Sequence, residues 1–461
     1  MPDAHHDLTL THRVMRLIRD QIARRQLSAG ARLPSIRSLA ETQKVSKSTV
    51  VEAYDRLLAE GVITARRGAG YFVAAAPAPL SLAEIGPQLD RQIDPLWVSR
   101  QSLETKDYLK PGCGWLPPEW MPEDDIRRAL RALARNPKAD LLDYSTPAGH
   151  AGLRQLLSRR LAEKDIEAAP GQIILMDSAT QAIELLCRFL LRPGDTVLVD
   201  DPCYFNFLAK LRAHQVQVIG VPYTPTGPDM AALTEALEVH RPRLYLTNTA
   251  MHNPTGASLS PVNAHRLLKL AEAHDLTIIE DDIYSDFELE PGPRLSAFDG
   301  FERVVYVGGF SKALSASIRL GYVAARADWI EALTDLKIAT LFSSQTFAAE
   351  LVCQVLSDGH YRKHLDTLRQ RLAAVRGPTA EKLEALGLKP WLRPQAGMFL
   401  WCELPEGHDA SDLARRALAE RIVLAPGDAF SVSRTATRFL RFNIAQSQDP
   451  RLFAFLKANV R

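Results

Sequence analysis

The pattern of hydrophobic and polar positions changes twice along the chain. Over the first 75 residues, apolar side chains recur every three or four positions, which predicts helices that begin near residues 10, 35 and 46. Thr11 and Ser35 are placed to cap the first two of these helices. The runs 62–64 and 71–73 flank a basic, glycine-rich stretch, so a β-hairpin is predicted there.

An alanine- and proline-rich stretch, residues 74–80, interrupts this pattern. Its composition is typical of a semi-rigid linker, which we expect to continue irregularly to about Lys106. From residue 108 onward, short apolar runs alternate with helical segments, which predicts an α/β domain with a covered, largely parallel sheet of seven strands. The predicted strands are 173–176, 197–199, 216–221, 244–247, 277–280, 304–307 and 320–324.

The last hundred residues predict a smaller α+β region, with strands near 398–402 and 439–444. The chain therefore divides into a helical unit, 1–75, a linker, 76–107, and an α/β domain, 108–461. Charge divides in the same way. The first 75 residues hold 12 Lys and Arg against seven Asp and Glu, a net charge of +5, and the remainder holds 44 against 47, a net charge of −3. The N-terminal unit is thus the part that suits a polyanion.

Cysteine usage and the N-terminus exclude several classes of protein. The five cysteines are scattered without metal-ligand or redox spacing, and an odd number argues against a disulfide framework, so no metal site is expected. The first residues lack the basic and apolar regions of a signal peptide, and no apolar run reaches the roughly 18 residues of a membrane span. We therefore expect a cytoplasmic protein that has no contact with a membrane.

The third predicted helix opens with the polar residues Ser46–Thr49, while Val50, Tyr54 and Leu57 occupy its other face. A helix that enters the major groove of DNA presents short polar and basic side chains at its first turn. Arg37 on the preceding helix is close enough in sequence to add a contact. The alternative is a small helical domain with a solvated basic face.

Five segments of the N-terminal unit resemble the GntR-type winged helix in order and spacing, over about 65 residues. They are LPSIRSLA at 33–40, VSKSTV at 45–50, AYDRL at 53–57, EG at 60–61 and RGAGYFV at 67–73. The resemblance implies that double-stranded operator DNA is a partner of the chain. It implies that the DNA contacts are Arg37, Lys47, Ser48, Thr49 and Gly68.

Several polar residues of the α/β domain follow predicted strands, where the sites of α/β proteins form. Lys312 closes the run Gly308–Lys312, although a lysine in such a turn, taken alone, is better explained as a surface residue. Asp281 follows a strand and precedes Tyr284 by three residues, although 280–282 also fits a plain acidic turn. Asn253 begins an Asn-Pro-Thr-Gly turn after another strand.

The remaining candidates are equally ambiguous when taken singly. Residues 178–180 open a helix, whose free amides suit a phosphate, although Ser178 could simply be an N-cap. Tyr204 follows a strand and is suited to stack on a ring. Tyr144 lies in a loop before a helix. Arg441 lies inside an apolar strand, where it needs an anionic partner, and its planar fork suits a carboxylate.

Together these residues supply what a pyridoxal 5′-phosphate (PLP) site requires: a lysine, an acid for the pyridine nitrogen, donors to the phenolate oxygen, a phosphate cradle and an arginine for a carboxylate. Their order resembles that of the fold type I aminotransferases over about 350 residues. The resemblance implies a homodimer, with Lys312 bound covalently to the cofactor and Asp281 on the pyridine nitrogen. It implies Asn253 and Tyr284 on the phenolate oxygen, Tyr204 on the ring, Arg441 on the substrate carboxylate, and Ala179, Thr180, Ser311 and Arg319 on the phosphate.

The same resemblance implies that Tyr144 reaches the phosphate in the other subunit of the dimer. Gly309 departs from the family pattern, because a Ser or Thr often contributes a phosphate ligand at that position. The order of the two domains resembles the MocR subfamily of GntR regulators. Two hypotheses follow: a PLP-dependent regulator that senses an amino acid, an amine or PLP, and a working aminotransferase that carries a DNA-binding module. The presence of the whole residue set disfavours a third, a degenerate enzyme fold that only dimerises.

Overall fold

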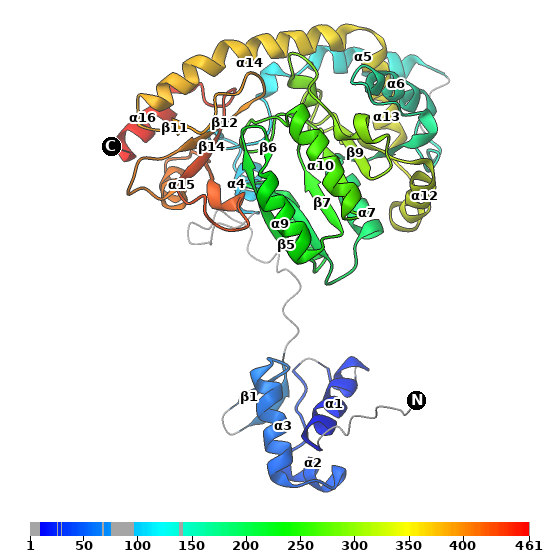
Figure 1. Cartoon of the computed structure of the whole chain (residues 1–461), viewed down its shortest axis with the longest axis vertical. Coiled ribbons are helices and arrows are strands. Elements are labelled where there is room, and N and C mark those ends of the chain that lie inside the picture. Colours follow the sequence, from blue (N-terminus) through cyan, green and yellow to red (C-terminus); the bar gives the residue numbers. More distant parts are fainter. Residues whose placement is uncertain are drawn as a thin grey trace. The chain divides into compact units, whose positions relative to one another are not determined.

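The computed structural model describes residues 10–24, 26–28, 30–66, 69–74, 96–137 and 142–460. The chain forms two compact units, Met1–Gly86 and Pro87–Arg461 (Figure 1). Each unit has its own buried hydrophobic core. In the described part of the chain, no helix combines the length and the apolar character that crossing a membrane requires.

The first unit contains three helices and a hairpin. These are α1 (Leu10–Ala23), α2 (Ile36–Gln43), α3 (Lys47–Ala59), β1 (Ile63–Arg66) and the antiparallel β2 (Gly70–Val73). As predicted, Ser35 caps α2 by accepting from Ser38 N at 3.2 Å. The prediction for Thr11 is wrong, because α1 already includes it and its hydroxyl donates to Glu52 Oε2 at 3.2 Å.

The second unit is built on an eight-stranded sheet with the order β3-β10-β9-β8-β7-β4-β5-β6. All seven predicted strands are present, and the additional β6 is two residues long. Pairs β4-β5, β4-β7, β7-β8 and β8-β9 are parallel, whereas β10 is antiparallel to both neighbours. The strands are β3 (Ile173–Met176), β4 (Thr196–Asp201), β5 (Gln217–Thr224), β6 (Gly227–Pro228), β7 (Leu244–Thr247), β8 (Thr277–Asp281), β9 (Val304–Gly309) and β10 (Gly321–Ala324).

Helices cover both faces of this sheet. Val197 and Val199 pack with α7 (Ala179–Leu190), α8 (Phe205–Ala213) and α12 (Ala327–Leu341), whereas the intervening Leu198 packs on the opposite face with α9 (Met230–His240) and α10 (Pro261–Ala273) (Figure 1). Continuous apolar strands are the result expected of a sheet buried on both faces. The other helices of this domain are α5 (Glu123–Arg135), α6 (Ala151–Ala162), α11 (Leu295–Asp299) and α13 (Thr346–Ser357).

The C-terminal part forms the predicted smaller α+β region. Its antiparallel sheet has the order β11-β12-β14-β13, with β11 (Lys389–Pro390), β12 (Phe399–Glu403), β13 (Ala425–Pro426) and β14 (Phe439–Asn443). The helices α15 (Ala410–Ala419) and α16 (Pro450–Asn459) belong to it, and α14 (His360–Glu384) leads into it from the large domain. The two central strands coincide with the segments predicted from the sequence.

One expectation about the linker is wrong. Residues expected to be irregular up to Lys106 include α4 (Trp97–Glu104). Trp97 and Val98 on this helix are buried in the core of the second unit, at 2% and 1% exposure. The burial of these two apolar side chains stabilises a helix that has no side-chain cap at its start. The linker boundaries themselves, 76 and 107, stay a prediction.

Candidate functional site

The carboxyl ends of the central parallel strands bring the predicted site residues to one cavity. Asp281 is the last residue of β8, Asn253 follows β7, and Tyr204 follows β4. The cavity is lined by nine of the eleven residues predicted for the cofactor and its substrate, namely Ala179, Thr180, Tyr204, Asn253, Asp281, Tyr284, Ser311, Lys312 and Arg319. Tyr144 and Arg441 are outside this lining. Lys210 and Asn248 line it although the sequence analysis did not single them out.

Lys312 points its amine into the cavity. Its Nζ donates to the carbonyl of Gly114 at 2.7 Å and lies 5.7 Å from the centre of the Tyr284 ring. Burial, with a contribution from the nearby Arg441, lowers the pKa of Lys312 to about 8. A lysine with a lowered pKa keeps more of its amine neutral near pH 7, and the neutral amine is the form that attacks a carbonyl carbon.

Asp281 lies on the same cavity wall and is 5% exposed. Burial raises the pKa of Asp281 to about 7, while the hydrogen bond that Ile283 N donates to Oδ1 at 3.2 Å acts in the opposite direction. A cation placed against this carboxylate would favour its charged form. The side chain is therefore suited to a protonated ring nitrogen.

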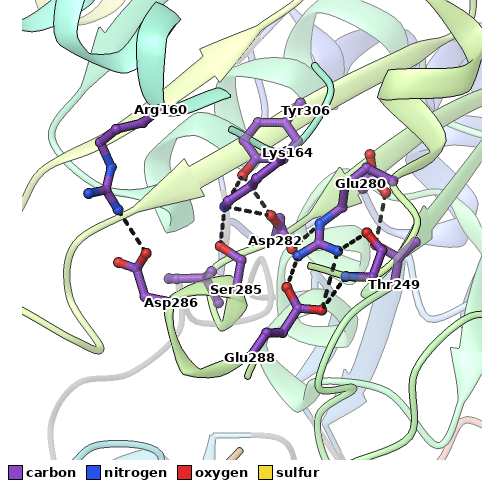
Figure 2. Close-up of polar contacts among 12 residues, drawn as sticks. Arg160, Lys164, Thr249, Glu280, Asp282, Ser285, Asp286, Glu288 and Tyr306 are labelled. Carbon is purple, nitrogen blue, oxygen red and sulfur yellow. Dashed lines mark hydrogen bonds and ion pairs between the residues drawn. The ribbon is translucent and has the colours of Figure 1, made fainter. Parts of the chain in front are cut away.

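Glu280 and Asp282, on either side of Asp281, point into a buried polar network on the other side of the strand (Figure 2). Asp282 accepts from Tyr306 OH at 2.7 Å and forms ion pairs with Arg294 at 2.9 Å and Lys164 at 3.2 Å. Burial opposes ionisation of Asp282, but these cations hold its pKa below the usual value. The consecutive acids are thus not a solvated turn, and only Asp281 faces the cavity.

Asn253 and Tyr284 form a hydrogen-bonded pair beside Lys312. Asn253 Nδ2 donates to Tyr284 OH at 3.2 Å, and Asn253 N donates to Asn248 Oδ1 at 2.9 Å. Burial raises the pKa of Tyr284, so its hydroxyl stays protonated near pH 7 and available as a donor. Two donors converge on one region of the cavity, which is the arrangement that a phenolate oxygen requires.

Arg441 lies on β14 behind Asn253 and is 1% exposed. Its Nη1 donates to Asn253 Oδ1 at 2.6 Å and its Nη2 donates to the Gly112 carbonyl at 2.7 Å. Its Nε is buried without an acceptor among the described residues, and none of their carboxylates pairs with it. A buried cation that lacks a carboxylate partner is unusual, because its desolvation is costly, so Arg441 is suited to an anionic ligand.

Gly114 shows that Lys312 and Arg441 face the same space. A Cβ atom at position 114 would lie 3.6 Å from Lys312 Nζ and 3.8 Å from Arg441 Nη2. A molecule placed there would lie beside the amine that is able to hold a carbonyl cofactor and beside a buried guanidinium. A molecule that carries an amino group and a carboxylate on one carbon suits such a space once a carbonyl cofactor is held there.

The far end of the cavity is formed by the start of α7. Ser178 caps this helix by accepting from Gln181 N at 3.1 Å, and Ala179 and Thr180 line the cavity. The N-cap interpretation of Ser178 is therefore correct, and it leaves the first-turn amides directed at the cavity. Close packing fixes this end, because a Cβ at Gly321 would lie 2.4 Å from Ala179 N.

Tyr144 lies away from this cavity. Its side chain is exposed at 73%, and its ring contacts Phe342 edge-on at 4.9 Å. The resemblance assigned it to the phosphate in the other subunit of a dimer, so a single chain does not test that role. In the described residues, no group of three or more His, Cys, Asp or Glu is arranged to hold a metal ion.

The predicted DNA contacts lie on the first unit. Lys47, Ser48 and Thr49 form the first turn of α3, where Ser46 caps the helix by accepting from Thr49 N at 3.1 Å. Lys47 and Ser48 are exposed, whereas Val50, Tyr54 and Leu57 on the opposite face are fully buried. The Arg37 side chain is 79% exposed and pairs with Glu41 at 3.1 Å. Gly68 lies outside the described residues.

Comparisons with known proteins agree with both halves of this arrangement. Residues 10–73 match the family described as bacterial regulatory proteins, gntR family, and residues 120–458 match aminotransferase class I and II. The uncharacterized HTH-type transcriptional regulator YdcR of Escherichia coli is 31% identical over 93% of both chains. The probable rhizopine catabolism regulatory protein MocR of Rhizobium meliloti is 27% identical, over 92% of this chain and 87% of that protein.

The chain belongs to the MocR-like GntR regulators. It is a GntR-family transcriptional regulator fused to an aminotransferase-like domain of fold type I. Among solved structures, the α-aminoadipate aminotransferase LysN of Thermus thermophilus aligns with a TM-score of 0.70 and 26% identity, over 78% of this chain and 92% of that one. LysN was solved in complex with N-(5′-phosphopyridoxyl)-L-leucine.

The residues of this regulator fit such a cofactor. The cavity joins a lysine amine, a buried carboxyl and a paired amide and hydroxyl, and the helix amides of α7 lie at its other end. Lys210 and Asn248 had no marker in the sequence. Lys210 lies within an ordinary helix. The Asn248 side chain accepts a hydrogen bond from Asn253 N and donates one to the Asp281 carbonyl, and these contacts span 5 and 33 residues.

Proposed function

We propose that this regulator binds PLP and that an α-amino acid at the same site changes its affinity for operator DNA. The observation that carries the proposal is the convergence of Lys312, Asp281 and Arg441 on one site, in a chain whose other unit is a GntR-type winged helix. PLP supplies, when bound, an aldehyde that reacts with amines and a ring that withdraws electrons.

The residues of the chain divide the binding of the cofactor among them. Lys312 provides the amine that holds PLP covalently, and its lowered pKa keeps that amine reactive. Asp281 orients the ring nitrogen and keeps it protonated, and Asn253 and Tyr284 donate to the phenolate oxygen. Tyr204 covers a ring face, and Ala179, Thr180, Ser311 and Arg319 hold the phosphate.

The geometry favours an α-amino acid over a simple amine or free PLP as the effector. Arg441 and Lys312 lie on either side of the space opened by Gly114, at 3.8 and 3.6 Å from a Cβ built there. An amine alone would react with the cofactor that Lys312 holds and would leave Arg441 buried against Gly112 and Asn253. A carboxylate on the same molecule gives the arginine the charged partner that it lacks.

Double-stranded operator DNA is the proposed partner of the first unit. Lys47, Ser48 and Thr49 are presented at the start of α3, where the recognition helix of a winged helix meets the major groove. We propose a homodimer, since Tyr144 has a role only across a dimer interface, and a symmetric dimer reads two half-sites. Because operator DNA is the proposed partner, we also propose that the regulator is cytoplasmic.

The test is operator affinity measured for the full-length, PLP-loaded protein with and without each of the common L-amino acids. One or more of them should change the affinity by at least about fivefold, the lower range of allosteric coupling. Ethylamine and propionate, each bearing one of the two functional groups, should leave it unchanged. A response to ethylamine equal to that of every amino acid would contradict the proposed effector class.

A second candidate function is transamination. The complete residue set, with Lys312 and Arg441 facing one space, is what an aminotransferase requires. Steady-state assays of L-amino acids with 2-oxoglutarate separate the two functions. Turnover that operator DNA does not change, together with a DNA affinity that no amino acid changes, would favour the aminotransferase function. Slow or single turnover together with an affinity change would favour the sensor.

A further inference from the structure

A second cation, Lys210, lies at the cofactor cavity beside the predicted phosphate ligand Arg319. Lys210 is on α8 and lines the cavity together with Ser178, Thr180 and Arg319. The same lysine and arginine also line an adjoining open pocket with Ser178 and Thr180 from the start of α7. Both cations therefore border the end of the cavity at which the helix amides are directed.

Neither cation has an anionic partner in the part of the chain that the structure describes. No ion pair or side-chain hydrogen bond links Lys210 or Arg319 to another described residue. Glu184, which lines the open pocket together with Lys210, pairs instead with Arg188 and His214, each at 3.1 Å. Two basic side chains thus share one border without a direct ion pair to an acidic side chain of the described residues.

The surroundings of Lys210 make this imbalance costly. Burial lowers the pKa of Lys210, and the like charge of Arg319 adds to the effect, while Cys187, Asp281 and Glu184 oppose it. Lys210 is half-buried and Arg319 is exposed, so the cost falls mainly on Lys210. An ammonium that has lost part of its hydration is stabilised when it meets an anion. A doubly charged phosphate would satisfy both cations and the amides of α7 at once.

Position 309 supplies the second reason for an additional ligand. The aminotransferase pattern often has a Ser or Thr hydroxyl there, and this chain has glycine. A Cβ at Gly309 would lie 3.6 Å from the Ala179 Cβ and 3.4 Å from the Leu320 carbonyl, so the position adjoins Ala179, which lines this end of the cavity. One donor to the phosphate is therefore missing, and a nearby donor is unused.

We infer that Lys210 binds the phosphate monoester of the cofactor and compensates for the hydroxyl missing at position 309. The inference rests on the proposed function, since it requires PLP to occupy the cavity. It adds a ligand on α8, a helix that the family resemblance did not implicate. It also predicts that the affinity of this regulator for its cofactor depends on two cations, Lys210 and Arg319, rather than one.

The experiment compares PLP with pyridoxal, which lacks the phosphate, as ligands of the full-length protein. Dissociation constants are measured from the absorbance of the bound cofactor for wild type, Lys210→Met, Lys210→Arg and the surface control Lys269→Met. Lys210→Met should weaken PLP binding by at least about tenfold, the effect of losing one charge-assisted hydrogen bond. It should leave pyridoxal binding unchanged, and Lys210→Arg and Lys269→Met should bind PLP as wild type does.

Inorganic phosphate provides a further arm. It should weaken PLP binding to wild type by competing for the same cations, and it should do so less in Lys210→Met. Higher PLP affinity on addition of phosphate would overturn the inference, because it would place a separate ion beside the cofactor. Equal weakening of PLP and pyridoxal in Lys210→Met would also overturn it, since Lys210 would then act through Asp281 or the fold.

Unchanged PLP affinity in Lys210→Met would likewise reject Lys210 as a phosphate ligand, while leaving the proposed function intact. A failure of the wild-type protein to bind cofactor would instead test the proposed function. If wild type and Lys269→Met bind neither PLP nor pyridoxal, the proposed function itself fails, and the inference fails with it. Pyridoxal binding by Lys210→Met at the wild-type level shows that the variant is folded.

Discussion

The two units of this regulator hold their positive charges in opposite ways. In the winged helix, the proposed DNA contacts are at the surface: the Arg37 side chain is 79% exposed, and Lys47 lies on the exposed first turn of α3. In the aminotransferase-like domain, Arg441 is 1% exposed, and burial lowers the pKa of Lys312 to about 8. The same residue types therefore have different chemistry in the two units.

This difference teaches what each unit can recognise. Exposed cations attract any polyanion over a distance of about 10 Å at moderate salt, and added salt screens them. Buried cations are screened far less, and they bind tightly only a ligand whose negative charges contact them directly. We therefore expect salt to change mainly the affinity for DNA. We expect the loss of a single charged group from the effector to change mainly its affinity for the second unit.

The largest effect is expected from Lys312→Ala. Removal of this amine should abolish covalent attachment of PLP, because among the described residues the other lysine that lines the cavity is Lys210, which we assign to the phosphate. Borohydride reduction followed by peptide mapping measures the attachment site. The control Lys269→Ala removes an exposed lysine and should be labelled as wild type is. Label on a lysine other than 312 in the wild-type protein would show the assignment to be wrong.

Arg441→Ala should remove the response to an α-amino acid. The quantity to measure is the ratio of operator affinities with and without the amino acid, which should fall to one because the carboxylate has lost its cation. Arg438→Ala is a matched control, since this arginine precedes β14 and pairs with Glu403 rather than facing the site. A ratio that survives in Arg441→Ala would exclude the carboxylate role and weaken the contrast between the two units.

Asp281 gives the stability of the aminotransferase-like domain a pH dependence. In the cofactor-free protein its pKa is raised from 3.8 to about 7, so the folded state binds this proton more tightly than the unfolded state. The free energy of unfolding should therefore fall as pH rises from about 4 to about 7, by up to about 1.4 kcal/mol per pH unit, and level off above that range.

Asp281→Asn removes this titration. Without PLP, the Tm of wild type should fall relative to the Tm of Asp281→Asn as the pH rises over that range. Saturating PLP should flatten the wild-type curve, since a protonated ring nitrogen favours the charged carboxylate. Parallel curves for the two cofactor-free proteins would show that burial does not raise this pKa.

Much of this contrast could be predicted from the sequence, because local signals mark it. Asp281 and Asn253 each follow an apolar strand, and the order of the strands places their ends at one edge of the sheet. Ser35 and Ser46 are N-caps that sequence rules recognise directly. Family resemblance then assigned roles to residues, such as Tyr204, that local pattern leaves ambiguous.

What the sequence did not predict depends on contacts between distant segments. The acceptor for Lys312 is the Gly114 carbonyl, 198 residues away, and no side-chain type marks a backbone group. Lys210 lies at the cavity because α8 packs into the same hydrophobic core as α7. The helix α4 lacks a capping side chain and forms where Trp97 can be buried. Tertiary packing decides each of these features.

The smallest effect is expected from Lys47→Ala, which removes an exposed cation of the first unit. If Lys47 contacts one DNA phosphate, its loss should make the slope of log affinity against log salt shallower by about 0.9, because one fewer counterion is released. Operator affinity at moderate salt should fall by about tenfold or less. The matched control is Arg56→Ala, which removes a cation nearer the other end of α3, where Arg56 pairs with Glu52 at 2.6 Å. Equal slopes for Lys47→Ala, Arg56→Ala and wild type would remove Lys47 from the contacts, and a flat salt dependence in all three would argue against an electrostatic DNA interface.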